Sequence, residues 1–276
     1  MNYKNTVREI ISEIIHDQMT PTMKYYAFDW DDNLMYMPTK IYLKDDKGNS
    51  VGMSTEDFAE YRTKIGEKPF KYEGHTIVDF DENSFKNFRV PGDKLFMKDS
   101  MTAETGPAWS DFVEAVNNGS IFAIVTARGH TPSVIRNSIY NLIKQNKNGI
   151  SSSELVKNLK KYRELSDEDD LSNDELIKTY LDMCKYYPVT FGEGSAANPE
   201  ELKVKYMKEF MTYVKQMSQQ LQEKAFMKNK ISNYFNPFIG FSDDDIRNVN
   251  TMRKNFPNKD ELKIYATSKK GKEEYE

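Results

Sequence analysis

Residues 25–33 read Tyr-Tyr-Ala-Phe-Asp-Trp-Asp-Asp-Asn, a short apolar run that stops abruptly in acidic residues. A strand buried on both faces of a parallel sheet has this pattern, because its interior positions are apolar and polar residues begin at the sheet edge. Two further runs behave alike: residues 121–125 lead into Thr126, and residues 238–241 lead into Ser242 and three aspartates. The sequence therefore predicts buried parallel strands with polar side chains at their carboxyl ends.

Helical segments separate the strands. An apolar stripe at three- and four-residue spacing predicts a helix over 7–15, and Thr131-Pro132 is typical of a helix start. Further helices are expected at about 108–118, 199–224 and 247–254, and further strands at 186–191 and 262–266. Strands that alternate with helices predict an α/β fold, a Rossmann-like parallel sheet with helices on both faces.

Two insertions interrupt this pattern. Residues 35–101 consist of short β-like pieces separated by turn signals such as Asp45-Asp46-Lys47-Gly48-Asn49, which predicts an inserted β-rich module. Residues from about 144 to 186 are predicted to form a helical, acidic insertion. We therefore expect residues 1–34 and 102–276 to form the core.

Composition excludes several classes of protein. Of 276 residues, 38% are hydrophobic and 30% charged, which is too apolar for a disordered chain and too polar for a membrane protein. No apolar run approaches the ~20 residues that span a bilayer, and the first residues lack a signal-peptide core, so we expect no membrane partner and a cytoplasmic location. One cysteine and three scattered histidines argue against thiolate and histidine metal sites. The net charge of −4 indicates no overall basic surface, although local basic patches stay open.

Ligands of such sheets bind at the carboxyl ends of the strands, where the acidic residues lie. Carboxylates that converge there repel each other unless a cation lies between them, and an oxygen-only ligand set favours Mg²⁺. The expected metal ligands are Asp29, Asp31, Asp243 and Asp244.

Two other ligand sites fit the sequence poorly. An EF-hand loop starting at Asp29 would need Gly and Glu where Leu34 and Lys40 stand. The G-x-G-x-x-A pattern of residues 192–197 lacks a partner acid and is better explained as a turn leading into the 199–224 helix.

Three segments, residues 28–34, 124–128 and 241–245, resemble in order the first, second and fourth motifs of the haloacid dehalogenase-like phosphatases. The resemblance covers about half of the chain. It implies that Asp29 is the nucleophile that becomes an aspartyl-phosphate, and that Asp31 protonates the leaving group and then activates water.

The same resemblance implies the phosphate contacts. Thr126 would bind the phosphoryl oxygens, and we expect Asn33, Ala127 and Arg128 to contact substrate beside it. The start of the 199–224 helix resembles the third motif and indicates Lys203 as the lysine that neutralises the intermediate.

Some positions leave alternatives open. Lys205 is the close competitor of Lys203, and Lys228 and Lys230 lie nearer the last motif. Asn33 stands where the family usually has Thr, preceded by an additional acid, Asp32.

The resulting prediction is a Mg²⁺-dependent phosphatase acting on a phosphorylated small molecule or a nucleic-acid end. The 35–101 module would be the cap that selects the substrate. A group of its aromatic and basic residues offers nucleotide contacts: Tyr36, Tyr42, Tyr61, Lys64, Phe70, Lys86 and Arg89. Two alternatives remain: a phosphate-binding module without turnover, which Asn33 favours and Asp31 opposes, and a phosphotransferase such as a mutase.

Overall fold

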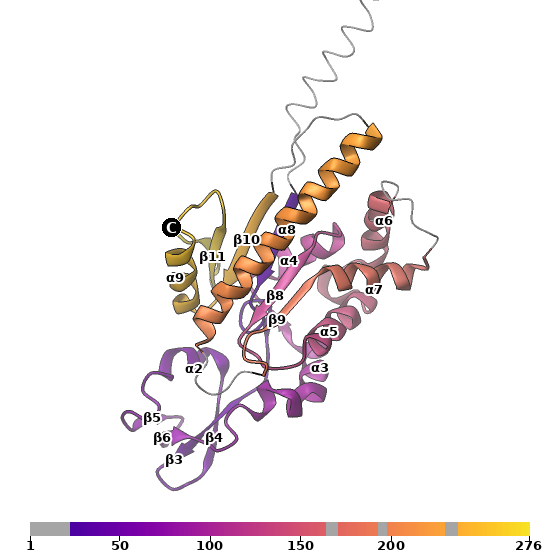
Figure 1. The fold of residues 1–276 in the computed structure, drawn as a ribbon. Helices are drawn as coiled ribbons and strands as arrows, with labels where there is room; N and C mark the ends of the chain where they lie inside the picture. The colour runs from indigo at the N-terminus through magenta and orange to yellow at the C-terminus, as the bar shows by residue number, and fades with distance from the viewer. Residues whose placement is uncertain (1–22, 164–170, 193–197, 230–236) are drawn as a thin grey trace, which may run out of the picture.

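The computed structural model describes residues 23–163, 171–192, 198–229 and 237–276, so the helix expected over 7–15 lies outside the described residues. Its centre is a six-stranded sheet in the order β12-β11-β10-β1-β8-β9 (Figure 1). The strands span Met23–Phe28 (β1), Phe122–Thr126 (β8), Lys185–Pro188 (β9), Pro237–Asp243 (β10), Lys263–Ser268 (β11) and Gly271–Glu274 (β12). The neighbouring strands run parallel, except β12, which is antiparallel to β11. The expected α/β fold with a mostly parallel sheet is confirmed.

Helices cover both faces of this sheet. One face carries α3 (Asp93–Thr102), α4 (Trp109–Asn117), α5 (Pro132–Lys144), α6 (Ser152–Arg163) and α7 (Asn173–Met183), and the other carries α8 (Pro199–Asn229) and α9 (Ile246–Asn255). The acidic insertion thus contributes α6 and α7 to the main core, and a 3-10 turn at Lys147–Gly149 precedes them. Within the described part of the chain, no helix is long and apolar enough to cross a membrane.

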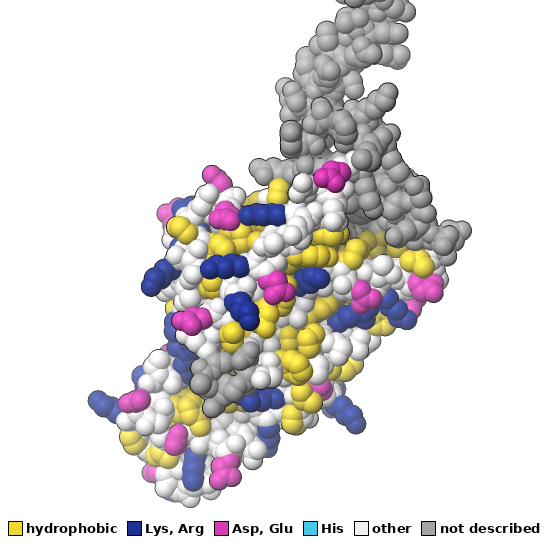
Figure 2. Space-filling model, viewed as in Figure 1, with side chains coloured by type: hydrophobic (Ala, Val, Ile, Leu, Met, Phe, Trp, Pro, Cys, Tyr) yellow, Lys and Arg dark blue, Asp and Glu magenta, His cyan; other side chains and the backbone are white. Residues whose placement is uncertain are grey.

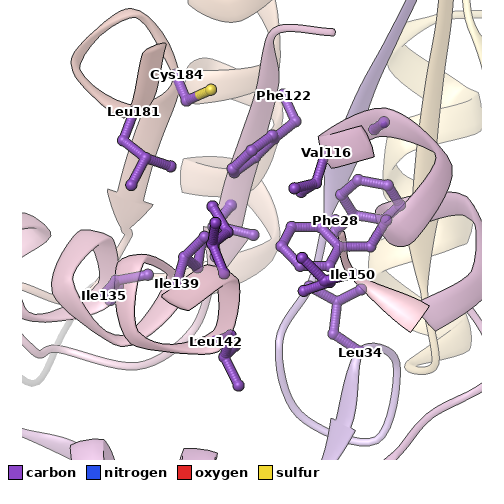
Figure 3. Close-up of a cluster of buried hydrophobic side chains, with 14 of the residues drawn as sticks. Phe28, Leu34, Val116, Phe122, Ile135, Ile139, Leu142, Ile150, Leu181 and Cys184 are labelled. Atoms are coloured by element: carbon purple, nitrogen blue, oxygen red, sulfur yellow. The ribbon is translucent and has the colours of Figure 1, made fainter. Parts of the chain in front are cut away.

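The alternation of side chains along β1 explains the two layers. Tyr26 and Phe28 pack into the cluster under α3–α7, whereas Tyr25 and Ala27 pack against α8 and α9. Figure 3 shows Phe28 among the apolar side chains of the first cluster. Because successive strand residues point to opposite faces, a strand that is apolar at every position requires helices on both.

The predicted β-rich insertion forms a second sheet. Four antiparallel strands lie in the order β4-β3-β6-β5: Ile41–Asp45 (β3), Ser50–Met53 (β4), Phe70–Tyr72 (β5) and His75–Phe80 (β6). The helix α2 (Thr55–Tyr61) joins β4 to β5, and 3-10 turns at Lys86–Phe88 and Val90–Gly92 lead back to the core. Figure 1 shows this module at the end of the main sheet, beside the start of α8.

The module is smaller than the predicted range 35–101. Its own hydrophobic cluster runs from Ile41 to Phe88. Met35, Met37 and Phe96 instead pack in the main core, and the short pair β2 (Met35–Tyr36) and β7 (Glu104–Thr105) closes the base of the insertion. Short segments near a domain boundary carry no periodicity that would assign them to either core.

Asn33 fastens the carboxyl ends of three strands together. It is 0% exposed, and its Nδ2 donates to the Asp29 carbonyl (3.0 Å) and to Ser242 Oγ (3.1 Å). Thr267 Oγ1 in turn donates to Asn33 Oδ1 (2.9 Å). One buried amide therefore links β1, β10 and β11 at the edge where the acidic residues lie.

Replacement of Asn33 by alanine should lower the free energy of unfolding by about 2–4 kcal/mol, because several buried polar groups lose a partner at once. Urea unfolding followed by circular dichroism measures this. Asn255→Ala is the matched control: this exposed asparagine makes one bond, to the Thr251 carbonyl, and its loss should change stability by at most about 0.5 kcal/mol. Equal effects of the two substitutions would contradict the structural role of Asn33.

Candidate functional site

A cavity of about 310 Å³ lies between the carboxyl edge of the main sheet and the small module. The core contributes polar side chains from three strand ends and from α8, among them Asp29, Asp31, Thr126, Lys203 and Asp244. The small module contributes an apolar wall of Ile41, Phe58, Phe85 and Phe88. The module also contributes Thr55, Arg62 and Arg89, so the cavity combines a cluster of core carboxylates with a mixed, partly apolar lining, a composition common in small-molecule sites.

The Lys203 ammonium lies among the core carboxylates. It is 1% exposed and donates to Asp29 Oδ1 and Asp243 Oδ2, both at 2.7 Å. Burial lowers the pKa of Lys203, but Asp243 and Asp29 outweigh this effect, so the pKa is raised and the lysine stays charged.

The start of α8 determines which lysine occupies this place. Asn198 accepts from the Glu200 amide (3.1 Å) and Pro199 opens the helix, so Lys203 points inward one turn later. Lys205 is exposed on another side of the helix. The side chain of Lys228 and the whole of Lys230 lie outside the described residues. The structure therefore places Lys203, and not Lys205, in the site.

Three aspartates form a compact group around this lysine. Oxygen atoms of Asp29, Asp243 and Asp244 all lie within 4.8 Å of one another. The Asp29 amide donates to the Ser242 carbonyl (3.0 Å), which holds the two strand ends side by side. Asp243 Oδ1 accepts from the Asp245 amide (3.0 Å) and from Asn248 Nδ2 (2.9 Å), so this carboxylate is fixed in orientation.

Burial and mutual repulsion disturb the ionisation of this group. Burial, against the opposing effect of Lys203, raises the pKa of Asp29 to about 8 and also raises the pKa of Asp243. For Asp244, burial together with the charges of Asp243 and Asp29 raises the pKa well above its ordinary value. When all three are ionised, one ammonium leaves an excess of two negative charges, which a divalent cation with oxygen ligands would balance.

Asp31 is separate from this group. Its carboxylate receives two bonds from Arg128, Nε to Oδ2 (2.8 Å) and Nη2 to Oδ1 (2.6 Å), in the forked geometry typical of arginine. Asp31 lines the cavity, but its side chain is not part of the group formed by Asp29, Asp243 and Asp244, whereas the sequence predicted it to be a metal ligand with them.

Arg128 is buried and has several polar and aromatic neighbours. Besides Asp31, it donates to Thr39 Oγ1 (3.1 Å), and its guanidinium lies 4.5 Å from the Phe88 ring centroid. Nη1 lies 3.2 Å from His130 Nε2, which must accept, so Nδ1 of His130 carries the proton and donates to Asp93 Oδ1 (2.7 Å). Arg128 thus orients Asp31, a role that we did not assign to it from sequence.

The remaining predicted residues divide between the cavity and the core. Thr126 and Ala127 line the cavity, and Thr126 Oγ1 accepts from the Arg128 amide (3.2 Å). Asn33 does not line it and has the structural role described above. Asp32, to which we had given no role, also lines the cavity. Its backbone is in the left-handed region, with φ at 53°. Burial raises the pKa of its carboxyl group to about 6, although a hydrogen bond from Thr55 opposes this effect.

Most of the expected nucleotide contacts in the small module do not reach the cavity. Of the seven predicted residues only Arg89 lines it. Tyr61 stacks on Phe70 (5.1 Å), and Lys86 lies over the Tyr42 ring (4.9 Å). The aromatic side chains that do line it, Phe58, Phe85 and Phe88, have no sequence pattern to mark them, because module folding alone brings them to one face.

Comparisons of the chain with protein-family models, with curated proteins and with solved structures give no match.

Proposed function

We propose that this chain is a Mg²⁺-dependent phosphatase of the haloacid dehalogenase-like type, which hydrolyses a phosphomonoester through an aspartyl-phosphate on Asp29. The observation that carries the proposal is the bridging of Asp29 and Asp243 by the buried Lys203 at the end of two adjacent strands. A nucleophile, a fixed cation and a second carboxylate are thereby held at one point. The small module would act as the cap over this point.

In the proposed reaction, an oxygen of Asp29 attacks phosphorus while the bond from phosphorus to the leaving oxygen breaks. In its protonated form, which requires the forked bonds from Arg128 to open because they favour the carboxylate, Asp31 gives its proton to that oxygen. It then takes a proton from the water that attacks phosphorus, which releases inorganic phosphate and restores the Asp29 carboxylate. Lys203 and the hydroxyl of Thr126 would stabilise the charge on the phosphoryl oxygens, and Arg128 would orient Asp31.

The donor set suits Mg²⁺, because it consists of clustered carboxylate oxygens without nitrogen or sulfur. Asp29, Asp243 and Asp244 would hold the ion, and the bonds from Lys203 and Asn248 orient Asp243. The bound ion would neutralise phosphoryl charge and keep Asp29 ionised.

The alternative is a phosphate-binding module without turnover. It rested on Asn33, whose three hydrogen bonds join strands and leave the cavity side chains intact. A screen of phosphate esters with and without Mg²⁺, with alcohol acceptors included, separates hydrolysis, phosphotransfer and binding alone.

Asp29→Asn should abolish turnover of every substrate, because an amide does not attack phosphorus. Phosphate release from an aryl phosphate measures this, and an unchanged circular dichroism spectrum shows that the fold persists. The exposed Asp46→Asn serves as the control and should keep the full rate. A normal rate in Asp29→Asn would remove Asp29 as the nucleophile.

Asp31→Asn should slow hydrolysis of alkyl phosphates by about 10²–10⁴-fold, the usual contribution of a positioned acid and base. Aryl phosphates with good leaving groups need less protonation and should lose less in the phosphorylation step, which is measured by a rapid burst of the released phenol. An equal loss across leaving groups would refute the role of Asp31 as the acid.

Asp244→Asn should weaken Mg²⁺ binding in calorimetric titrations by at least about tenfold, because the cation loses a charged ligand. Asp245→Asn is the matched control. Asp245 accepts from the Arg247 amide (2.9 Å) and caps α9, a role that asparagine fills about as well, so this substitution should leave the fold and the Mg²⁺ affinity unchanged. The reverse ranking would exclude Asp244 as a ligand.

A further inference from the structure

A second and larger groove, of about 1050 Å³, opens beside the candidate active site. It runs over the first turns of α8 and along α9 from its first turn to its last. Arg62 and Pro199 line both hollows, so the groove and the cavity meet at these residues. A molecule longer than a single phosphate ester could therefore occupy both.

The groove is rich in positive charge, unlike the chain as a whole. Five cationic residues line it: Arg62, Lys205, Lys208, Arg247 and Lys254. The two lining acids are Glu200, which pairs with Arg62, and Glu201. Figure 2 shows dark-blue side chains over α9 and the first half of α8.

Three of these cations are available to a ligand. Arg62 and Arg247 are engaged by Glu200 and Asp245. The lysines at 205, 208 and 254 are exposed and have no ion-pair partner among the residues that the structure describes. Lys205 and Lys208 are three residues apart on one helix, so they face the same side. A lone phosphate held by Lys203 needs none of these three lysines.

The cavity itself offers a surface for a planar group. Phe58, Phe85 and Phe88 line the cavity and pack edge to face, with centroids 5.6 Å and 6.4 Å apart. Arg128 lies over the buried Phe88 ring, so the half-buried rings of Phe58 and Phe85 are the ones open to a planar group. Arg89 is exposed and also lines the cavity. Stacking of bases on aromatic rings beside a cationic path for the backbone is the general way in which proteins bind single-stranded nucleic acid.

We propose that the groove binds the phosphodiester backbone of a single-stranded nucleic acid whose terminal phosphate enters the Asp29 site. This rests on the proposed function for the terminal phosphate, whereas binding of the strand in the groove does not. The aromatic wall favours a nucleic acid over inorganic polyphosphate, which has nothing to stack. The repeated cations favour it over a phosphopeptide, which carries no regular negative charge.

The binding experiment uses a fluorescein-labelled 15-nucleotide deoxythymidine strand with hydroxyl ends, so that turnover plays no part. Fluorescence anisotropy at several salt concentrations gives the affinity and its salt dependence. Lys205→Gln/Lys208→Gln should weaken binding about tenfold and reduce the slope of log K against log[salt] by about 1.4, the value for two lost phosphate contacts on a single strand.

Lys157→Gln/Lys160→Gln is the matched control, since these two exposed lysines have the same spacing on α6, which does not line the groove. This variant should bind the strand as the wild type does. Absence of wild-type binding at low salt, an equal loss in both double variants, or equally tight binding of polyphosphate of matched charge would each overturn the proposal.

A second measurement tests whether a strand bound in the groove places its terminal phosphate in the Asp29 site. The ratio of kcat/KM for a phosphate-ended 15-mer to that for a mononucleotide should exceed one and fall about tenfold in Lys205→Gln/Lys208→Gln. A ratio of one in the wild type would overturn entry of a strand end into the Asp29 site. Failure of the phosphatase proposal is distinguishable, because the hydroxyl-ended strand would still bind while no phosphate ester is hydrolysed.

Discussion

The Lys203 ammonium lies between two buried carboxylates, and the arrangement of the site depends on this contact. Loss of one partner from a buried ion pair costs about 3–5 kcal/mol, because the remaining charge is left without compensation. The same contact keeps Asp29 and Asp243 close while Asp244 adds further negative charge. When all three aspartates are ionised, this end of the sheet carries more negative charge than Lys203 balances, and a bound cation would offset it.

Hydrogen bonds, and not packing alone, fix the positions of the charged side chains at this end of the sheet. Asn33 joins three strand ends, and Asn248 fixes Asp243. A chain of hydrogen bonds from the partly exposed Asp93 through the buried His130 and Arg128 reaches Asp31. These polar groups are paired and most of them are buried, so each holds a defined orientation that an apolar substitute would not impose.

The small module supplies what the core lacks. The core brings charge to the cavity, and the module brings an apolar aromatic wall. Contacts across the junction, such as Arg247 to the Ala59 carbonyl (2.7 Å), hold the module beside α9 and next to the basic groove. The cavity therefore takes its side chains from both parts of the chain, and its composition depends on how the module packs on the core.

The sequence by itself determined the α/β class, the strand ends at Asp29, Thr126 and Asp243, and the helix start before Lys203, because periodicity and caps are local properties. It did not reveal the short polar strand β12 (Gly271–Glu274), whose pairing depends on β11. Only the tertiary structure decided that Lys203 is the buried lysine, that Asn33 is structural, and that Arg128 binds Asp31. Each of those outcomes includes a contact between residues 97 or more positions apart in the chain, and no local sequence pattern predicts such a contact.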